Sequence, residues 1–218
     1  MRKKKQKIKI QVHDLRKWAS GKHKTADDKP YGGGCGMVLK IEPIYRAIAH
    51  LVGKKAVKKI LDKAYIKKGT KIILLSPKGK NFNNTCAKSF SKLKHIIFVC
   101  GHYEGVDERV KRLVTEEISI GDYILTGGEI ASMVIVDAMA RFIPGVLGDK
   151  RSVECESFEN NLLEHPHYTR PREFEGMKVP EILLSGDHGA INEWRDAESL
   201  KKTKNTRRDL YKLFTKKS

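Results

Sequence analysis

The stretch SIGDYILTGGE, residues 119 to 129, combines residue types that suit ligand binding. Two acids, Asp122 and Glu129, and a pair of glycines, Gly127 and Gly128, separate two strongly apolar segments. Glycine lacks a Cβ, so this pair allows either a tight strand-to-helix turn or a ligand lying directly against the backbone. In the first case Glu129 would be favoured at the start of the next helix, where a negative charge is stabilised. Both interpretations stay open on this stretch alone.

Several familiar signatures of catalysis and nucleotide binding are missing. There is no G-x-x-x-x-G-K-[ST] phosphate loop and no strand–turn–helix elbow around a serine. GGGCG at 32–36 fits a G-x-G-x-G pattern, but it follows DDKPY and not a strand, so the match carries little weight. The four cysteines, Cys35, Cys86, Cys100 and Cys155, are too scattered to close a zinc site, and we expect free thiols and no metal site.

The charge of the chain predicts a polyanionic partner. Its 218 residues contain 44 Lys and Arg against 26 Asp and Glu, a formal net charge of +18. A lysine-rich surface without a specific partner is the alternative, because phosphate recognition would favour Arg. No apolar run approaches the roughly 20 residues of a membrane span, and the basic N-terminus has no signal-peptide core behind it. We therefore expect a cytoplasmic protein.

Strands and helices alternate along the first part of the chain, which predicts an α/β fold with a mostly parallel sheet flanked by helices. Residues 7–14 alternate apolar and polar side chains as a half-buried strand does. Further strands are expected at 71–76, 95–101 and 118–125, and helices at 37–52, 106–117 and 129–143. The last of these is nearly all apolar, which predicts a buried helix. A helix is expected at 189–202 and a basic helix towards the C-terminus.

Three of the predicted strands end in glycine-bearing sequences. SPKG, read as a turn, follows the strand at 71–76, CGHYEG follows the strand at 95–101, and LTGGE ends the third. Ligands of parallel α/β sheets bind at the carboxyl ends of the strands. The convergence of three such ends favours a ligand pocket over three unrelated turns.

A series of blocks gives the chain a specific resemblance. DDKPYGGGCGM, LLSPKG, CGHYEGVDERV, SIGDYILTGGE, RFIPGVLG, PHYTRP and GMKVPEILLSGDH run in this order through almost the whole sequence. Together they resemble the bacterial tRNA (guanine-N1)-methyltransferases, a family of the trefoil-knotted SPOUT superfamily. The resemblance implies a knotted sheet domain that binds S-adenosyl-L-methionine, and transfer of its methyl group to N1 of the guanine immediately 3′ of the anticodon.

The cofactor contacts implied by the resemblance are mostly backbone. They fall on Leu75, Ser76, Pro77, Gly101, Ile120, Gly121, Asp122, Tyr123, Ile124, Leu125, Gly127 and Gly128. On this reading Gly127 and Gly128 leave room for the cofactor and for the chain crossing of the knot.

The chemistry requires a base and a cation, because N1 of guanine bears a proton and its loss leaves charge on the neighbouring oxygen. The family's Arg corresponds to Arg141, for which an ion pair with Asp137 is the alternative role. The family's catalytic Asp corresponds to Glu156, a departure that keeps the carboxylate and adds a methylene. Another register of this stretch would place Glu154 there.

The resemblance also implies contacts with the RNA substrate. Glu104 corresponds to a contact with the guanine or the methionine amine, unless it is only a helix-start acid. Asp28, Gly33 and Gly34 correspond to base contacts, unless the glycines only make a flexible loop, and Ser152 would lie in the linker. We expect phosphate contacts at Arg170, Arg207 and Arg208. A requirement for Mg²⁺ does not follow from the sequence.

The expected organisation is a cofactor-binding catalytic domain at 1–147, a linker at 148–170 that orders on substrate binding, and a basic tRNA-binding domain at 171–218. The resemblance implies a homodimer whose active sites combine both subunits. The family begins with an apolar strand that has no counterpart here, so we expect the working enzyme to be longer at its N-terminus. A SPOUT enzyme acting on ribosomal RNA and a non-catalytic basic RNA-binding protein are the alternatives.

Overall fold

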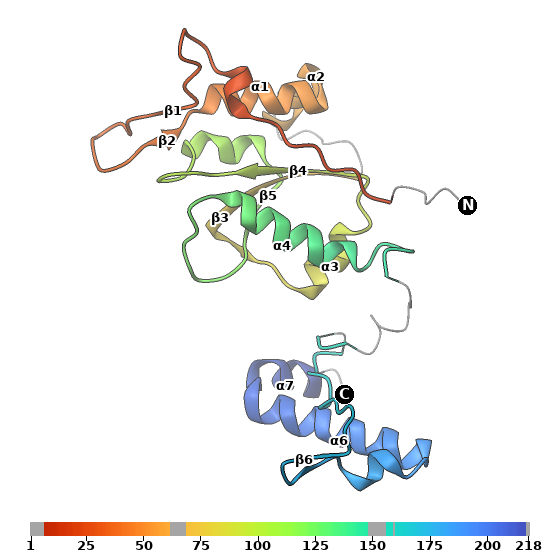
Figure 1. Cartoon of the computed structure of the whole chain (residues 1–218). Helices are drawn as coiled ribbons and strands as arrows, with labels where there is room; N and C mark the ends of the chain where they lie inside the picture. Colours follow the sequence, from red (N-terminus) through yellow and green to blue (C-terminus); the bar gives the residue numbers. More distant parts are fainter. Residues whose placement is uncertain (1–6, 62–68, 148–155, 159, 217–218) are drawn as a thin grey trace. The chain divides into compact units, whose positions relative to one another are not determined.

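A computed structural model describes residues 7–61, 69–147, 156–158 and 160–216 (Figure 1). The chain divides into two compact units, Met1–Leu147 and Gly148–Ser218. We call them unit 1 and unit 2. Among the described residues, no helix combines the length and the apolar character that crossing a membrane requires.

Unit 1 contains a three-stranded parallel sheet. Its strands are β3 (Thr70–Asn81), β4 (His95–Cys100) and β5 (Glu116–Ser119), in the order β4-β3-β5. The central strand β3 pairs in parallel with both neighbours, with Leu74 opposite Val99 and Leu75 opposite Ile118. This sheet and its flanking helices confirm the predicted α/β class with a mostly parallel sheet.

Helices cover both faces of this sheet, as Figure 1 shows. Helices α1 (Ile41–Val52) and α2 (Lys54–Leu61) and the 3-10 helix η2 (Glu108–Leu113) pack on one face, and α3 (Asn84–Phe90) and α4 (Gly128–Ala140) on the other. Successive residues of a strand point to opposite faces. Ile72 and Leu74 therefore join the core beneath α1, whereas Ile73 and Leu75 join the core beneath α4. Complete burial of each such side chain stabilises the fold by roughly 1.5–3 kcal/mol.

A small two-stranded hairpin lies beside this sheet. Strand β1 (Asp27–Asp28) pairs antiparallel with β2 (Val38–Leu39), and the loop between them contains the GGG sequence. The carbonyl of Leu39 accepts a hydrogen bond from Asp107 N at 2.9 Å, and its N–H donates to Gly105 O at 3.0 Å. The hairpin is thus fastened to the segment that follows β4.

Unit 2 is mainly helical. It contains the hairpin β6 (Glu173–Phe174) and β7 (Met177–Lys178), the 3-10 helix η3 (Glu181–Leu184), and helices α6 (His188–Thr206) and α7 (Arg208–Thr215). Asp187 caps α6 by accepting hydrogen bonds from the N–H groups of Gly189 and Ala190. The buried Thr203 accepts from Leu163 N through its hydroxyl at 2.8 Å, which ties the segment before the hairpin to α6.

The predicted strand at 7–14 is wrong. These residues run as an extended segment without strand pairing and lead into the 3-10 helix η1 (Leu15–Trp18). Val12 is 92% exposed. Alternating apolar residues make a strand only when a neighbouring strand supplies hydrogen bonds, and no described strand lies against this segment.

Three further predictions of local structure need correction. The helix expected at 106–117 is a short 3-10 turn, η2, and β5 begins earlier than the strand predicted at 118–125 and ends at Ser119. SPKG is no separate turn, because β3 continues through it with a register shift between Leu75 and Lys80, both opposite Ile118. Helix α4 is only partly buried, since Met133 on its outer face is 69% exposed.

Candidate active site

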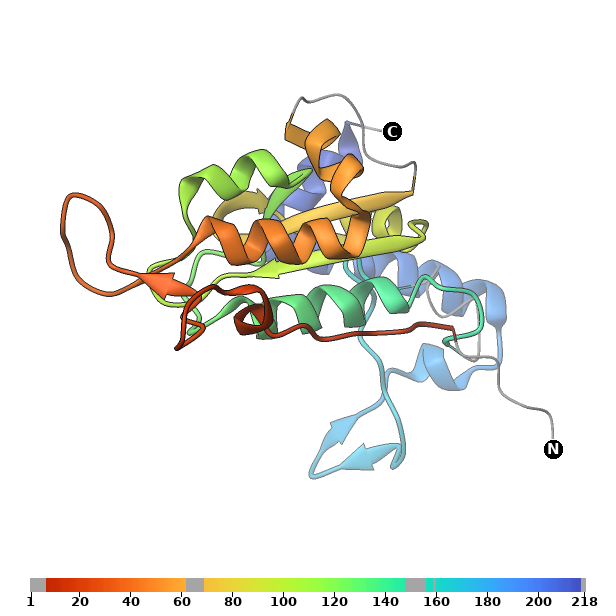
Figure 2. The same cartoon turned by 90° about the horizontal axis from the view of Figure 1, so that it is seen from above.

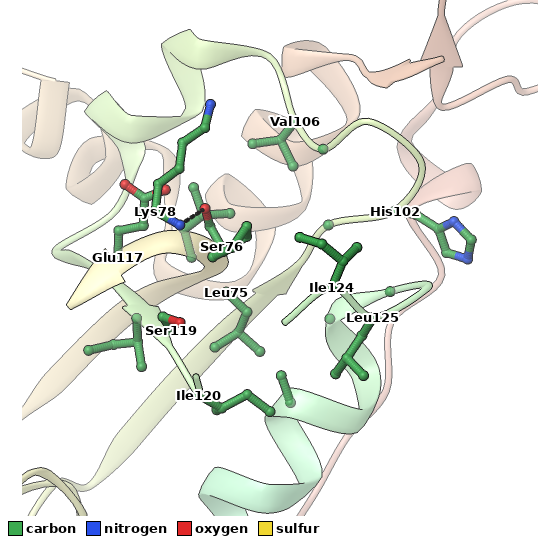
Figure 3. Close-up of a pocket in the computed structure, with 18 of the residues that line it drawn as sticks. Leu75, Ser76, Lys78, His102, Val106, Glu117, Ser119, Ile120, Ile124 and Leu125 are labelled. Carbon is green, nitrogen blue, oxygen red and sulfur yellow. Dashed lines mark hydrogen bonds between the residues drawn. The ribbon is translucent and has the colours of Figure 1, made fainter. Parts of the chain in front are cut away.

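A cavity of about 360 Å³ lies at the carboxyl ends of the three parallel strands (Figure 3). Its walls come from 74–78 of β3, from 101–106 after β4, and from 117–121 and 123–128 between β5 and α4, with further residues of η2 and α4. These are the three glycine-bearing strand ends, so the sheet brings together segments that are far apart in the sequence. A volume of this size suits a small organic ligand.

Two glycines permit the close packing of these segments. Gly128 N donates a hydrogen bond to Gly101 O at 2.9 Å, where α4 begins beside the end of β4. A Cβ at Gly128 would lie 2.8 Å from Cys100 Cα, closer than real Cβ contacts allow. Gly121 has φ +145°, a conformation that other residues rarely adopt. The glycines of this corner therefore meet neighbouring backbone as well as the cavity.

One side of the cavity is apolar. Leu75, Val106, Ile124 and Leu125 lie around it in Figure 3, and Ile124 is 80% exposed within this chain. The hydroxyl of buried Ser119 accepts from Gly121 N and donates to Gly121 O, both at 3.1 Å, and so holds the corner after β5. An apolar wall next to backbone polar groups suits a flat heterocycle with polar edges.

Another part of the cavity is lined by charged residues. The sequence had assigned no role to them. Lys111 Nζ lies 2.8 Å from Glu108 Oε1 and 3.4 Å from Glu117 Oε2. The hydrogen bond that Lys111 donates to Glu108 and the charge of Glu117 hold the pKa of Lys111 above its usual value. The mixture of acids and bases in ERVKRLVTEE was the available signal. A helix was expected there, and a helix would have paired Glu108 with Lys111 but turned Glu117 to another face.

The predicted cofactor contacts gather at this cavity with one exception. The lining includes Leu75, Ser76, Pro77, Gly101, Ile120, Gly121, Tyr123, Ile124, Leu125, Gly127 and Gly128. Asp122 is exposed and not part of the lining. His102, Tyr103 and Lys78 also line the cavity, although the sequence assigned them no function.

The predicted base contacts divide between the cavity and the β1–β2 hairpin. Glu104 lines the cavity, and its N–H donates to Met37 O at 3.1 Å. Asp28 is exposed at the end of β1. Gly33 and Gly34 lie in the hairpin loop with φ +79° and +125°. Glu104 is therefore the predicted base contact that both lines the cavity and touches the hairpin.

Neither residue of the predicted catalytic pair is among the residues that line this cavity. Arg141 is the exposed C-cap of α4, whereas Gly128 at the cavity begins this helix. Thirteen helical residues separate the two ends, which corresponds to roughly 20 Å. Glu156 is half-buried and belongs to unit 2. Asp137 is exposed like Arg141, so the ion pair considered for them would not be buried.

The predicted tRNA contacts lie in unit 2. Arg207 pairs with Asp209 at 2.6 Å and lies over the ring of Phe158, whereas Arg208 is exposed at the start of α7. The pairing lowers the pKa of Asp209 to about 2. Arg170 is exposed. Ser152 lies outside the described residues.

Cys100 is held as a neutral thiol next to the cavity. Burial, aided by the charge of Glu129, raises its pKa to about 11. Cys35 and Cys86 are also free thiols, and Cys155 lies outside the described residues. A thiol with a raised pKa is a poor nucleophile, so Cys100 packs and does not react. In the described part of the chain, no group of three or more His, Cys, Asp or Glu side chains could hold a metal ion.

Fold and cavity define an α/β protein with a cavity of ligand size where its parallel strands end, joined to a helical unit. Comparison with known proteins specifies the class further. Residues 2–213 match the family described as tRNA (Guanine-1)-methyltransferase TrmD, and the chain belongs to this family.

Curated relatives carry the corresponding name. The tRNA (guanine-N(1)-)-methyltransferase of Listeria monocytogenes is 51% identical over 210 residues, which cover 96% of this chain and 82% of the relative. The protein of the same name from Carboxydothermus hydrogenoformans is 54% identical over 207 residues, 94% of this chain and 76% of the relative. That of Dictyoglomus turgidum is 54% identical over 203 residues, covering 93% and 77%.

Proposed function

We propose that this chain transfers a methyl group from S-adenosyl-L-methionine to N1 of the guanine immediately 3′ of the anticodon in tRNA. Membership of the family makes it a methyltransferase that acts on a guanine of tRNA. The observation that carries the proposal is the cavity formed by the three glycine-bearing strand ends, in a chain about half identical to enzymes of this name. The comparisons favour this function over methylation of ribosomal RNA and over non-catalytic RNA binding.

The cavity fits S-adenosyl-L-methionine in size and chemistry. Its apolar wall of Leu75, Ile124 and Leu125 suits an adenine ring, and the backbone around Gly101 and Gly121 offers hydrogen-bonding groups without side chains in the way. The charged group of Lys111, Glu108 and Glu117 provides partners for polar groups of the ligand. When bound, this cofactor supplies an electrophilic methyl group on a sulfonium.

The residues of this chain have two tasks in the reaction. Glu156 takes the proton from N1 of guanine, and Arg141 stabilises the negative charge that then develops on the neighbouring oxygen. Glutamate can replace the family's aspartate as base because both carry a carboxylate, and the added methylene changes only its reach. Glu104 at the cavity edge holds the guanine.

The position of Arg141 supports a homodimer with composite sites. This arginine lies one helix length from the cavity of its own chain, so a second subunit would have to supply an arginine to that cavity. Helix α4 also presents a continuous apolar strip to solvent, because Ile130, Met133 and Val134 are all exposed and follow helical spacing. Burying this strip against its copy would remove it from water.

Close backbone crossings support the trefoil knot. A Cβ at Gly79 would lie 2.6 Å from the carbonyl carbon of Ile118, and one at Gly128 would lie 2.8 Å from Cys100 Cα. Two chain segments pass each other at each point with no room for a side chain. Such contacts are expected where one part of the chain threads past another.

Unit 2 and the linker would bind tRNA. The exposed Arg170 and Arg208 suit the phosphate backbone, and the net charge of +18 of the whole chain favours a polyanionic partner. Ser152 and the rest of the linker would order on the bound tRNA. Asp28, Gly33 and Gly34 would contact bases from the β1–β2 hairpin. Because its substrate is tRNA, we place the enzyme in the cytoplasm.

The proposed function is tested by methylation of defined transcripts. Purified protein with labelled S-adenosyl-L-methionine should methylate a tRNA transcript that has G immediately 3′ of the anticodon, and should leave a transcript with A at this position unmodified. Mass spectrometry of the digested product should find 1-methylguanine. Methylation of ribosomal RNA with no activity on tRNA would contradict the proposal, and calorimetry without cofactor binding would exclude the whole class.

A further inference from the structure

Tyr31 in the β1–β2 loop is the most exposed large hydrophobic side chain in the described part of the chain. Its side chain is fully exposed, with a relative value of 101%. Aromatic rings usually contribute to stability by being buried, so a tyrosine held entirely in water does nothing for the folding of this chain. Such a ring is available to a partner.

The loop that carries Tyr31 is attached to the edge of the cavity. The hydrogen bonds of Leu39 with Gly105 and Asp107 join the hairpin to the wall formed after β4, and Met37 O accepts from Glu104 N. Gly36 packs against the side chain of Glu104, which itself lines the cavity. Figure 2 shows the loop, in orange, projecting from the rest of unit 1. The hairpin that carries Tyr31 is therefore anchored at the edge of the cavity.

The residues after Tyr31 leave both faces of the ring accessible. Gly32 and Gly33 have φ +84° and +79°, and no heavy atom lies within 4 Å of where their Cβ atoms would be. No side chain from this turn can cover the ring. The backbone would be strained with other residues, so the glycines keep a turn that presents Tyr31 openly.

The loop of the tyrosine carries positive charge. Lys29 is exposed two residues before Tyr31, and Lys22 and Lys24 precede β1. Arg109 is a further cation, with which Tyr31 interacts electrostatically. The pKa of Arg109 is raised first by its hydrogen bond with Asp107, and to a smaller extent by Glu42 and Tyr31. Exposed aromatic rings among basic side chains are typical of surfaces that bind single-stranded nucleic acid.

We propose that Tyr31 stacks on an unpaired base next to the target guanine and so positions the substrate loop at the cavity. This inference rests on the proposed function. RNA bases in loops can unstack from one another and stack on aromatic side chains, which is the usual way proteins hold them. A phenol ring on a short loop, fastened at the cavity edge and flanked by cations, meets these requirements.

The test compares Tyr31→Phe with Tyr31→Leu. Phenylalanine keeps the ring, whereas leucine keeps only the apolar bulk. Loss of one stacked base weakens binding roughly five- to a hundredfold. We expect Tyr31→Leu to raise the KM for tRNA within this range, and Tyr31→Phe to stay within about twofold of the wild type. The kcat at saturating tRNA, the affinity for the cofactor and Tm should not change.

Abasic substrates identify the stacked base. The base on either side of the target guanine is removed in turn, and the KM of wild type and Tyr31→Leu is measured for each substrate. For one of the two substrates the difference between the proteins should disappear. A difference that persists with both substrates, or a Tyr31→Leu enzyme equal to the wild type on intact tRNA, would overturn the inference.

Failure of the inference is separable from failure of the proposed function. If the wild type methylates tRNA and Tyr31→Leu does so with the same KM, only the stacking role is wrong. If the wild type does not methylate tRNA, the proposed function is wrong, and equilibrium binding of the two variants to tRNA then decides the stacking role. Weaker cofactor binding or a lower Tm in Tyr31→Leu would show a structural role and also overturn the inference.

Discussion

At the scale of single residues, Glu156 is the base that we propose, at a position where the resemblance to the family implies an Asp. The chemistry requires a base that can reach N1 of guanine, and a Glu reaches one methylene farther than the expected Asp. The half-buried position of Glu156 gives its side chain a restricted environment. The longer side chain therefore changes the position of the carboxylate, while the reactive group stays the same.

We predict that Glu156→Gln lowers kcat about 10²- to 10⁴-fold, because the amide cannot accept the proton. Glu156→Asp restores the family's residue and should retain turnover within about tenfold. Single-turnover methylation at saturating cofactor and tRNA measures both. Glu154→Gln is the matched control and should behave like the wild type. If Glu154→Gln loses turnover and Glu156→Gln does not, the base is Glu154.

At the scale of elements, glycines permit β3, β4, β5 and α4 to pack at backbone distance. Gly79 in the irregular part of β3 lies against the backbone at Ile118, and Gly128 at the start of α4 lies against Cys100. The backbone of Gly79 does not need a glycine-only conformation, so the space, and not the φ angle, is what excludes a side chain. The register shift of β3 at this point is part of the same close approach.

Gly79→Ala should therefore destabilise the protein by about 3 kcal/mol or more, because a backbone clash cannot be relieved by moving a side chain. The expected loss in Tm is roughly 5–10 °C, measured by differential scanning calorimetry. Gly189→Ala in the first turn of α6 is the control, since its Cβ would only meet the flexible Asp187 carboxylate at 3.3 Å. Equal Tm values for the two variants would contradict this account of the crossing.

At the scale of the whole molecule, the distribution of functional groups points to assembly. The cavity is complete at one end of α4 and the arginine proposed for catalysis lies at the other, with an exposed apolar strip between them. A monomer would keep this strip in water and would leave Arg141 away from its own cavity. Dimerisation would remove the strip from water and would allow Arg141 of one subunit to reach the cavity of the other.

Light scattering should find the wild type at twice its chain mass of 24.8 kDa. Met133→Asp places a charge in the strip and should give the monomer mass with loss of methylation, because burying an unpaired charge is costly. Met133→Leu keeps the apolar surface and should remain dimeric and active. A monomeric but fully active Met133→Asp protein would refute the composite site.

Much of the fold followed from local patterns. The buried strands at β3 and β4 and the helices α1, α4 and α6 were all expected from apolar runs and helical spacing, which depend only on neighbouring residues. The predictions for 7–14 and 106–117 were wrong because the structure there depends on residues that are distant in the sequence. An alternating pattern forms a strand only when a partner strand is present. The helical pattern at 106–117 is cut short because β5 takes up its last residues.

The sequence by itself determined the class of the protein, because its seven motifs occur in the same order as in one family. Such an order can be recognised without a structure. It also indicated which strand ends would meet, since parallel strands place their carboxyl ends together. Only the tertiary structure decided that Lys111, Glu108 and Glu117 form a charged part of the cavity and that Asp122 does not line it. It also decided that Tyr31 is exposed on a loop fastened to the edge of the cavity. These outcomes depend on which distant residues occupy the same space, and no local pattern encodes that.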